Sequence, residues 1–155
     1  MLRVHNVYDK TSSNGEGWRL AIFLAGCPHQ CEGCQNPQTW DFDSGHQINK
    51  SEIIERINNN REFIKGITWS GGESIQERYY EDIKGISDYA HSVGLDVWGY
   101  TGFQFGDLAD RWHNVFDTIV DGKFIKELAS KDCKFRGSSN QNIWRKINGR
   151  FELVD

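Results

Sequence analysis

Short apolar segments alternate along this chain with segments of helical periodicity, and no other feature limits its possible folds as strongly. The candidate strands are residues 19–25, 67–70, 96–101 and 118–120. The candidate helices are one that Ser51 caps, one over residues 76–93 and a short one over 108–112. This alternation predicts an α/β fold with a mostly parallel sheet and right-handed crossovers.

The composition excludes several classes of protein. The chain has 155 residues, with 18 basic and 22 acidic side chains and a net charge of −4, which does not suit a broad nucleic-acid-binding surface. No apolar run approaches the ~18–20 residues of a membrane-spanning helix, and the first residues lack the layout of a signal peptide. We therefore expect a cytoplasmic protein of one domain, residues 1–155, that binds neither nucleic acid nor a membrane.

Three of the four cysteines, Cys27, Cys31 and Cys34, lie within eight residues, directly after the first candidate strand. In a chain without signs of secretion, such a cluster indicates a metal or iron–sulfur site rather than a disulfide framework. A structural zinc ion would need a fourth ligand, for which His29 or Cys133 is available, although the second close ligand pair of most zinc knuckles is missing. The alternative is an iron–sulfur cluster held by three thiolates, with one iron left open for chemistry.

The other chemically distinctive segments also follow candidate strands. Gly71-Gly72-Glu73 comes after the second strand, Thr101-Gly102 ends the third, and Asp121-Gly122 comes after the fourth. Because parallel α/β folds bind ligands at the carboxyl ends of their strands, we expect these segments to meet the cysteine loop at one edge of the sheet.

Six segments of the chain form an ordered set of motifs: Gly15-Glu16-Gly17-Trp18-Arg19, Gly26-Cys27 to Cys34-Gln35-Asn36 with Thr39-Trp40, Ser70-Gly71-Gly72-Glu73, Tyr100-Thr101-Gly102, Val120-Asp121-Gly122-Lys123-Phe124 and Arg136-Gly137-Ser138-Ser139-Asn140-Gln141. In this order they resemble motifs of the radical S-adenosylmethionine superfamily, and within it those of the activating enzymes of the anaerobic (class III) ribonucleotide reductase. The resemblance therefore covers most of the chain.

The chain departs from the family pattern at three positions. Glu16 replaces the usual proline of the first segment, and Ser74 stands where a proline often follows the Ser-Gly-Gly-Glu segment. Gly33 occupies the position before the third cysteine, where most of the superfamily has an aromatic residue that meets adenine. The resemblance then leaves contact with adenine to the backbone near Gly33 and Gln35.

The resemblance implies a function and two cofactors. Cys27, Cys31 and Cys34 would ligate a [4Fe–4S] cluster, and the amino and carboxylate groups of S-adenosylmethionine would chelate the fourth iron. Reductive cleavage of S-adenosylmethionine would yield a 5′-deoxyadenosyl radical, which takes hydrogen from a glycine of the reductase and so activates it. The residues expected to contact S-adenosylmethionine are Gly33, Cys34, Gln35, Gly71, Gly72 and Glu73, where the carboxylate of Glu73 could attract the methionine ammonium.

The expected partners are the large glycyl-radical subunit of the anaerobic ribonucleotide reductase and a small electron donor such as a flavodoxin or ferredoxin. One alternative is an activase of another glycyl-radical enzyme, of the formate lyase type. A second is a non-catalytic zinc-binding module with His29 and Cys133 as additional ligands. We expect His29 to be a solvated or hydrogen-bonding loop residue and Cys133 to be dispensable. Residues 136–141 either contact the partner or close the ligand pocket, and the sequence does not decide between these two roles.

The chain length limits how far the sheet can close. Eight strand–helix units take about 250 residues, so this chain has room for roughly half of such a barrel. The fold expected is an incomplete, open (β/α) half-barrel of the radical S-adenosylmethionine type, with a curved sheet that leaves the site open on one side.

Overall fold

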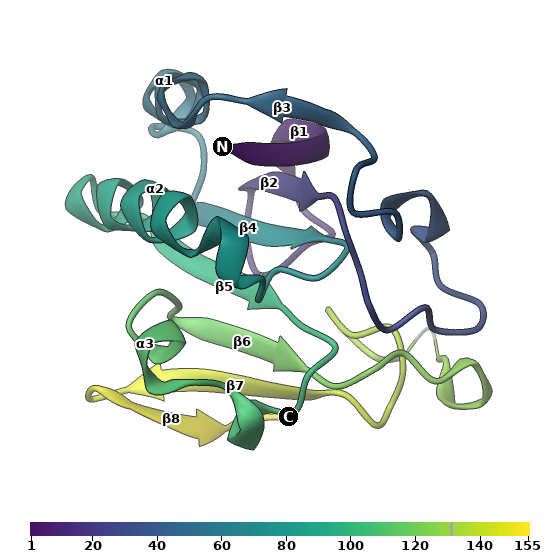
Figure 1. The fold of residues 1–155 in the computed structure, drawn as a ribbon. Coiled ribbons are helices and arrows are strands. Elements are labelled where there is room, and N and C mark those ends of the chain that lie inside the picture. The colour runs from purple at the N-terminus through teal and green to yellow at the C-terminus, as the bar shows by residue number, and fades with distance from the viewer. Residues whose placement is uncertain (131) are drawn as a thin grey trace.

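The computed structural model describes residues 1–130 and 132–155, which form an α/β fold around an eight-stranded sheet (Figure 1). The strands are β1 (Leu2–Thr11), β2 (Arg19–Leu24), β3 (His46–Ile48), β4 (Gly66–Gly71), β5 (Asp96–Tyr100), β6 (Thr118–Asp121), β7 (Asn142–Ile147) and β8 (Arg150–Leu153). The α-helices are α1 (Lys50–Asn60), α2 (Tyr80–Ser92) and α3 (Asp110–His113). Across the sheet the strand order is β3-β1-β2-β4-β5-β6-β7-β8.

The centre of the sheet is the parallel set β2, β4, β5 and β6, as the alternation of apolar and helical segments predicts. A helix precedes each of the last three of these strands, because a parallel connection needs a crossover of a dozen or more residues. The helix predicted to be capped by Ser51 begins instead at Lys50, with Asn49 at its N-cap. Figure 1 shows the arrowheads of β4, β5 and β6 pointing to the same side of the molecule.

The expectation of a mostly parallel sheet is wrong, because four antiparallel pairings flank this centre and make the sheet mixed. The sequence analysis did not identify β1, β3, β7 and β8 as strands. Only residues 12–18 connect β1 to β2, and Asn148 and Gly149 alone connect β7 to β8, with φ values of 53° and 79°. Such short connections form hairpins and cannot form crossovers, so β1 pairs antiparallel with β2 and β7 with β8.

The helices bury apolar faces in the same core as the central strands. Ile53 and Ile57 of α1, and Ile83 and Ile86 of α2, are fully buried in that core. Their spacing of three or four residues is the helical periodicity of the sequence. Among the residues that the structure describes, no helix combines the length and the apolar character that crossing a membrane would require.

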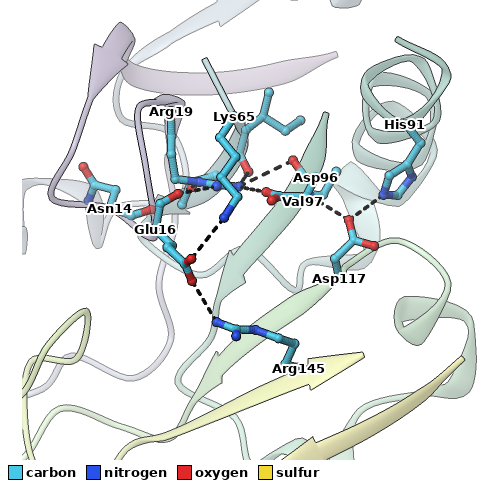
Figure 2. Close-up of polar contacts among 11 residues, drawn as sticks. Asn14, Glu16, Arg19, Lys65, His91, Asp96, Val97, Asp117 and Arg145 are labelled. Atoms are coloured by element: carbon cyan, nitrogen blue, oxygen red, sulfur yellow. Dashed lines mark hydrogen bonds and ion pairs between the residues drawn. The ribbon is translucent and has the colours of Figure 1, made fainter. Parts of the chain in front are cut away.

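A buried arginine joins the first residues of the central strands (Figure 2). The guanidinium of Arg19 is fully buried; it donates through Nε to Thr68 Oγ1 at 2.7 Å and through Nη2 to Ile67 O at 2.8 Å. It also pairs with the carboxylate of Asp96 and donates to Glu16 O. Burial lowers the pKa of Arg19, while Asp96 acts in the opposite direction. Arg19 therefore fixes β2, β4 and β5 to one another at their amino ends.

A second polar pair lies nearby, between α2 and the start of β6 (Figure 2). His91 Nε2 lies 2.7 Å from Asp117 Oδ2, which also accepts the Val97 N–H at 2.8 Å. The hydrogen bond with Asp117 raises the pKa of His91. Burial alone would raise the pKa of Asp117, but the hydrogen bonds from His91 and Val97 lower it overall.

Replacing Arg19 by leucine should destabilise the fold by about 3 kcal/mol, because Asp96 and Thr68 would lose a buried partner. Chemical denaturation of the cluster-free protein measures this change. Arg145→Leu is the matched control: it removes an exposed ion pair with Glu16 at 3.0 Å and should cost less than about 1 kcal/mol. Equal losses for the two variants would contradict the central role of Arg19.

The His91–Asp117 pair should make stability depend on pH. A raised histidine pKa contributes stability below ~6.5 that is lost as the pH rises through the folded-state pKa, and a lowered aspartate pKa contributes stability above ~4. His91→Gln should therefore cost about 0.5 kcal/mol near pH 5.5, a small value because both side chains are about one third exposed, and less near pH 8.5. Denaturation at both pH values tests this, with the exposed His46→Gln as control; a cost that grows with pH would contradict it.

Candidate functional site

A cavity of about 640 Å³ lies where the four parallel strands end, and its volume is within the ~300–1,000 Å³ of typical ligand sites. Its lining comes from the segments that follow β2, β4, β5 and β6, joined by residues of β1, the β1–β2 connection and residues 135–141. The meeting of these four segments at one edge confirms the expectation that the motifs following the candidate strands lie together. Of the residues singled out in the sequence, the lining includes Cys27, Cys31, Cys34, Gln35, Gly71, Gly72 and Glu73.

The cysteine loop is closed at its base by backbone hydrogen bonds. Gly26 N–H donates to Thr39 O at 2.6 Å, and Cys27 N–H donates to Trp40 O at 3.2 Å. Within the loop, Cys34 N–H donates to Cys31 O at 3.1 Å and makes a tight turn. The loop thus presents three half-buried thiols to one cavity.

The surroundings of the sulfur atoms suit iron–sulfur ligation. Cys34 Sγ accepts the backbone N–H of Asn36 at 3.3 Å. Burial raises the pKa of Cys27, while the backbone N–H groups of His29 and Gln30 act on its sulfur in the opposite direction. Hydrogen bonds to sulfur stabilise thiolates and tune clusters, so the donor set of this loop fits a [4Fe–4S] group.

Cys133 does not line the cavity that the other three thiols line. It belongs to the segment that connects β6 to β7, where its N–H donates to Ser130 O. Within residues 1–130 and 132–155, no three His, Cys, Asp or Glu side chains converge closely enough to hold a single metal ion.

The glycine pair Gly71-Gly72 at the end of β4 packs against the strand that leads into the cysteine loop. Gly72 N–H donates to Leu24 O at 2.9 Å, and a Cβ at position 72 would lie 2.3 Å from Gly26 O. A Cβ at Gly71 would lie 2.4 Å from Leu24 N, and its φ of +98° also favours glycine. Both glycines therefore let the backbone of β4 approach the start of the loop.

The carboxylate of Glu73 is fully buried and is surrounded by donors. Oε1 lies 2.6 Å from His29 Nε2 and accepts Gly102 N–H at 2.8 Å. Oε2 accepts Ile75 N–H and the Thr101 hydroxyl, each at 2.7 Å. One side chain thus joins the cysteine loop to the segments that follow β4 and β5.

Gly33 is not among the lining residues of the cavity. The space beside it is occupied by an aromatic ring from a part of the chain that is far away in sequence. A Cβ at Gly33 would lie 3.4 Å from Cε2 of Phe124, whose ring is also within reach of a Cβ at Gly137. Phe124 lines the cavity and was not singled out as a site residue. The signal that could have found it was the family-like segment Val120-Asp121-Gly122-Lys123-Phe124.

Arg136, Gly137 and Gln141, from the segment whose role the sequence left undecided, form one wall of the cavity. The Gln141 side chain accepts the N–H groups of Gly137 and Ser138 at 2.7 and 3.1 Å and donates to Gly122 O at 2.8 Å. These hydrogen bonds fix the wall to the segment that follows β6. Tyr100, whose pKa is raised by burial, donates to Phe135 O at 2.9 Å and supports the same wall.

A solved structure has a similar fold. QueE from Escherichia coli superposes with a TM-score of 0.51 at 14% sequence identity. The match covers 65% of this chain and 52% of that chain, so this chain spans about half the length of QueE. At this identity the likeness concerns the fold alone.

Sequence comparisons are more specific. A family model described as "4Fe-4S single cluster domain" matches residues 13–144. Three proteins named "Anaerobic ribonucleoside-triphosphate reductase-activating protein" are similar to this chain. That of Salmonella typhimurium is 36% identical over 150 residues, which cover 92% of this chain and 97% of the relative. That of Escherichia coli K12 is 35% identical with the same coverage, and that of enterobacteria phage T4 is 32% identical over 147 residues, covering 92% and 94%.

The extent of these matches decides the family. The family model spans most of the chain, and the three relatives are covered almost over their full length. The chain therefore belongs to the family of anaerobic ribonucleoside-triphosphate reductase-activating proteins, within the 4Fe-4S single cluster domain family.

Proposed function

We propose that this chain activates an anaerobic ribonucleoside-triphosphate reductase by generating a glycyl radical on its large subunit. One observation carries the proposal: three half-buried thiols of a single closed loop line the cavity at the ends of the parallel strands. The names of the relatives supply the reaction partner, and the family model supplies the cluster. The chain then acts as an oxidoreductase of the radical S-adenosylmethionine class.

Cys27, Cys31 and Cys34 would hold a [4Fe–4S] cluster with one iron free of protein ligands. When bound, the cluster and S-adenosylmethionine supply one-electron cleavage of the sulfonium and a carbon radical that abstracts hydrogen from the partner's glycine. The chain orients both groups: the loop base and the Asn36 N–H position the thiolates. A small electron donor, such as a flavodoxin or ferredoxin, would provide the electron in a cytoplasmic setting.

S-adenosylmethionine would lie between the cysteine loop and the segment after β4. Gln35, Gly71 and Gly72 line the cavity there, beside Cys34. The Gly33 backbone lies at the same turn, and the Phe124 ring would offer adenine the aromatic contact that position 33 lacks. Glu73 would contribute indirectly, because its hydrogen bonds hold the cysteine loop and the segment after β5 in place.

We further propose that residues 1–155 act as one activase domain whose sheet is an open half-barrel. The cavity mouth would then be covered by the glycine-bearing loop of the reductase. Such closure matters because an active site must exclude water and stray hydrogen donors from a reactive intermediate. Exposed apolar side chains occur near this mouth: Tyr8 and Phe103, 46% and 37% exposed, belong to or flank segments that line the cavity.

Single replacement of Cys27, Cys31 or Cys34 by alanine should abolish cluster binding and activation, because each change removes one corner ligand. The fold should persist, since the core strands do not depend on these thiols. Iron and sulfide analysis after anaerobic reconstitution, together with the absorption spectrum, measures the loss. Cys133→Ser is the control and should keep the cluster; a cluster lost in Cys133→Ser but kept in one of the other three variants would refute the ligand assignment.

The glycyl radical should form on the reductase and should require the radical-site glycine of that protein. The reduced, cluster-loaded protein is mixed anaerobically with S-adenosylmethionine and the reductase, and electron paramagnetic resonance should detect a glycyl radical doublet. Cleavage of S-adenosylmethionine should accumulate roughly in step with that signal. If a reductase with its radical-site glycine changed to alanine gained the same signal, or if the intact reductase gained none, the activase function would be wrong.

A further inference from the structure

We infer that His29 and Glu73 form a positioning pair that holds the cysteine loop against the ends of β4 and β5 before any cluster binds. His29 lies at the middle of the loop, between Cys27 and Cys31, and Glu73 lies on the segment after β4. The inference deepens the proposed function, since it takes this loop to be the one that carries the cluster. It assigns to both residues a role other than contact with the ligand.

The hydrogen bonds around Glu73 have a defined direction. The backbone N–H groups of Gly102 and Ile75 can only donate, and each meets a different carboxylate oxygen. The Thr101 hydroxyl accepts Phe103 N–H at 3.1 Å and is thereby oriented to donate to Glu73. Because an ionised carboxylate only accepts, we assign His29 the tautomer with hydrogen on Nε2.

The four contacts use the acceptor capacity of the carboxylate. An ionised carboxyl group has about four lone-pair sites, and here His29, Thr101 and the two N–H groups occupy them. The Glu73 side chain is 1% exposed. It is therefore committed to the chain itself and acts on the site through the segments it joins.

The His29 ring is also fitted sterically. Its side chain is 6% exposed and packs edge-on against Phe103, with ring centroids 4.7 Å apart. A Cβ at Gly102 would lie 2.4 Å from the ring, so the glycine after Thr101 makes room for it. The His29 ring thus packs against Gly102 and Phe103 of the segment after β5.

Other contacts of the loop do not replace this link. The base of the loop is closed at Gly26 and Cys27, which leaves the sulfur-bearing stretch to be held separately. Glu32 faces Lys126 at 3.8 Å, with both side chains largely exposed, and such a pair contributes little. The buried His29–Glu73 hydrogen bond, near a carboxylate and shielded from water, is the stronger restraint.

Hydrogen exchange of the cluster-free protein tests the inference. In His29→Ala, peptides that cover residues 26–36 should exchange about tenfold faster or more, because a charge-assisted hydrogen bond is lost. Peptides from β1 and β2 should exchange at the wild-type rate. His29→Gln, which can donate from a position close to Nε2, should restore most of the protection, as a mere loss of ring packing would not.

His91→Gln is the matched control, since it removes another histidine–carboxylate hydrogen bond of similar length, 2.7 Å, at the opposite end of the strands. It should leave the exchange of residues 26–36 unchanged. The inference is overturned if His29→Ala exchanges this loop at the wild-type rate, if the glutamine variant behaves like the alanine variant, or if the faster exchange extends equally over the whole sheet.

A second measurement uses the reconstituted protein. Release of iron to a chelator should be several-fold faster in His29→Ala than in the wild type and in His91→Gln, and near the wild-type rate in His29→Gln. Equal release rates in all four proteins would contradict the pair's effect on the cluster. If the wild type itself took up no cluster, the proposed function would fail, while the exchange experiment would still decide whether the pair orders the loop.

Discussion

The site depends on the parallel register of β2, β4, β5 and β6. Arg19 lies opposite Gly66 in the register of β2 and β4, and Gly66 lies opposite Asp96 in that of β4 and β5. The buried guanidinium of Arg19, which belongs to β2, pairs with groups of β4 and β5 and so aligns the starts of the three strands. Strands of similar length that start together also end together, which brings the segments after them to one edge.

Two buried ionic groups hold the opposite ends of these strands. Arg19 serves the amino ends, and Glu73 serves the carboxyl ends, where the cysteine loop must stay in place. Burying a charge is expensive unless each of its hydrogen-bonding positions has a partner. Glu73 has four donors around its carboxylate, and each of the three guanidinium nitrogens of Arg19 has a partner. The two groups thereby define one arrangement of the strands and loops, a specificity that apolar contacts alone do not supply.

The sequence predicted the central part of the fold better than its edges. The runs that became β2, β4, β5 and β6 are rich in apolar residues because both of their faces are covered, and such runs are easily recognised. In β8, by contrast, Phe151 is the only residue that is not exposed, so its pattern resembles that of a loop. The sheet is mixed because β1, β3, β7 and β8, which the sequence did not reveal, pair antiparallel at its two sides. At the site, the thiols were found from their spacing, the role of residues 136–141 was left undecided, and Phe124 was not singled out.

By itself, the sequence determined the α/β class, the parallel direction of the central strands and the three thiols on one loop, because these follow from local periodicity and spacing. Only the tertiary structure decided which distant groups would meet that loop. The partner of His29 lies 44 residues away on the segment after β4, and the ring beside Gly33 comes from the segment after β6. Such contacts depend on the order and register of strands in the sheet, and no local pattern encodes them.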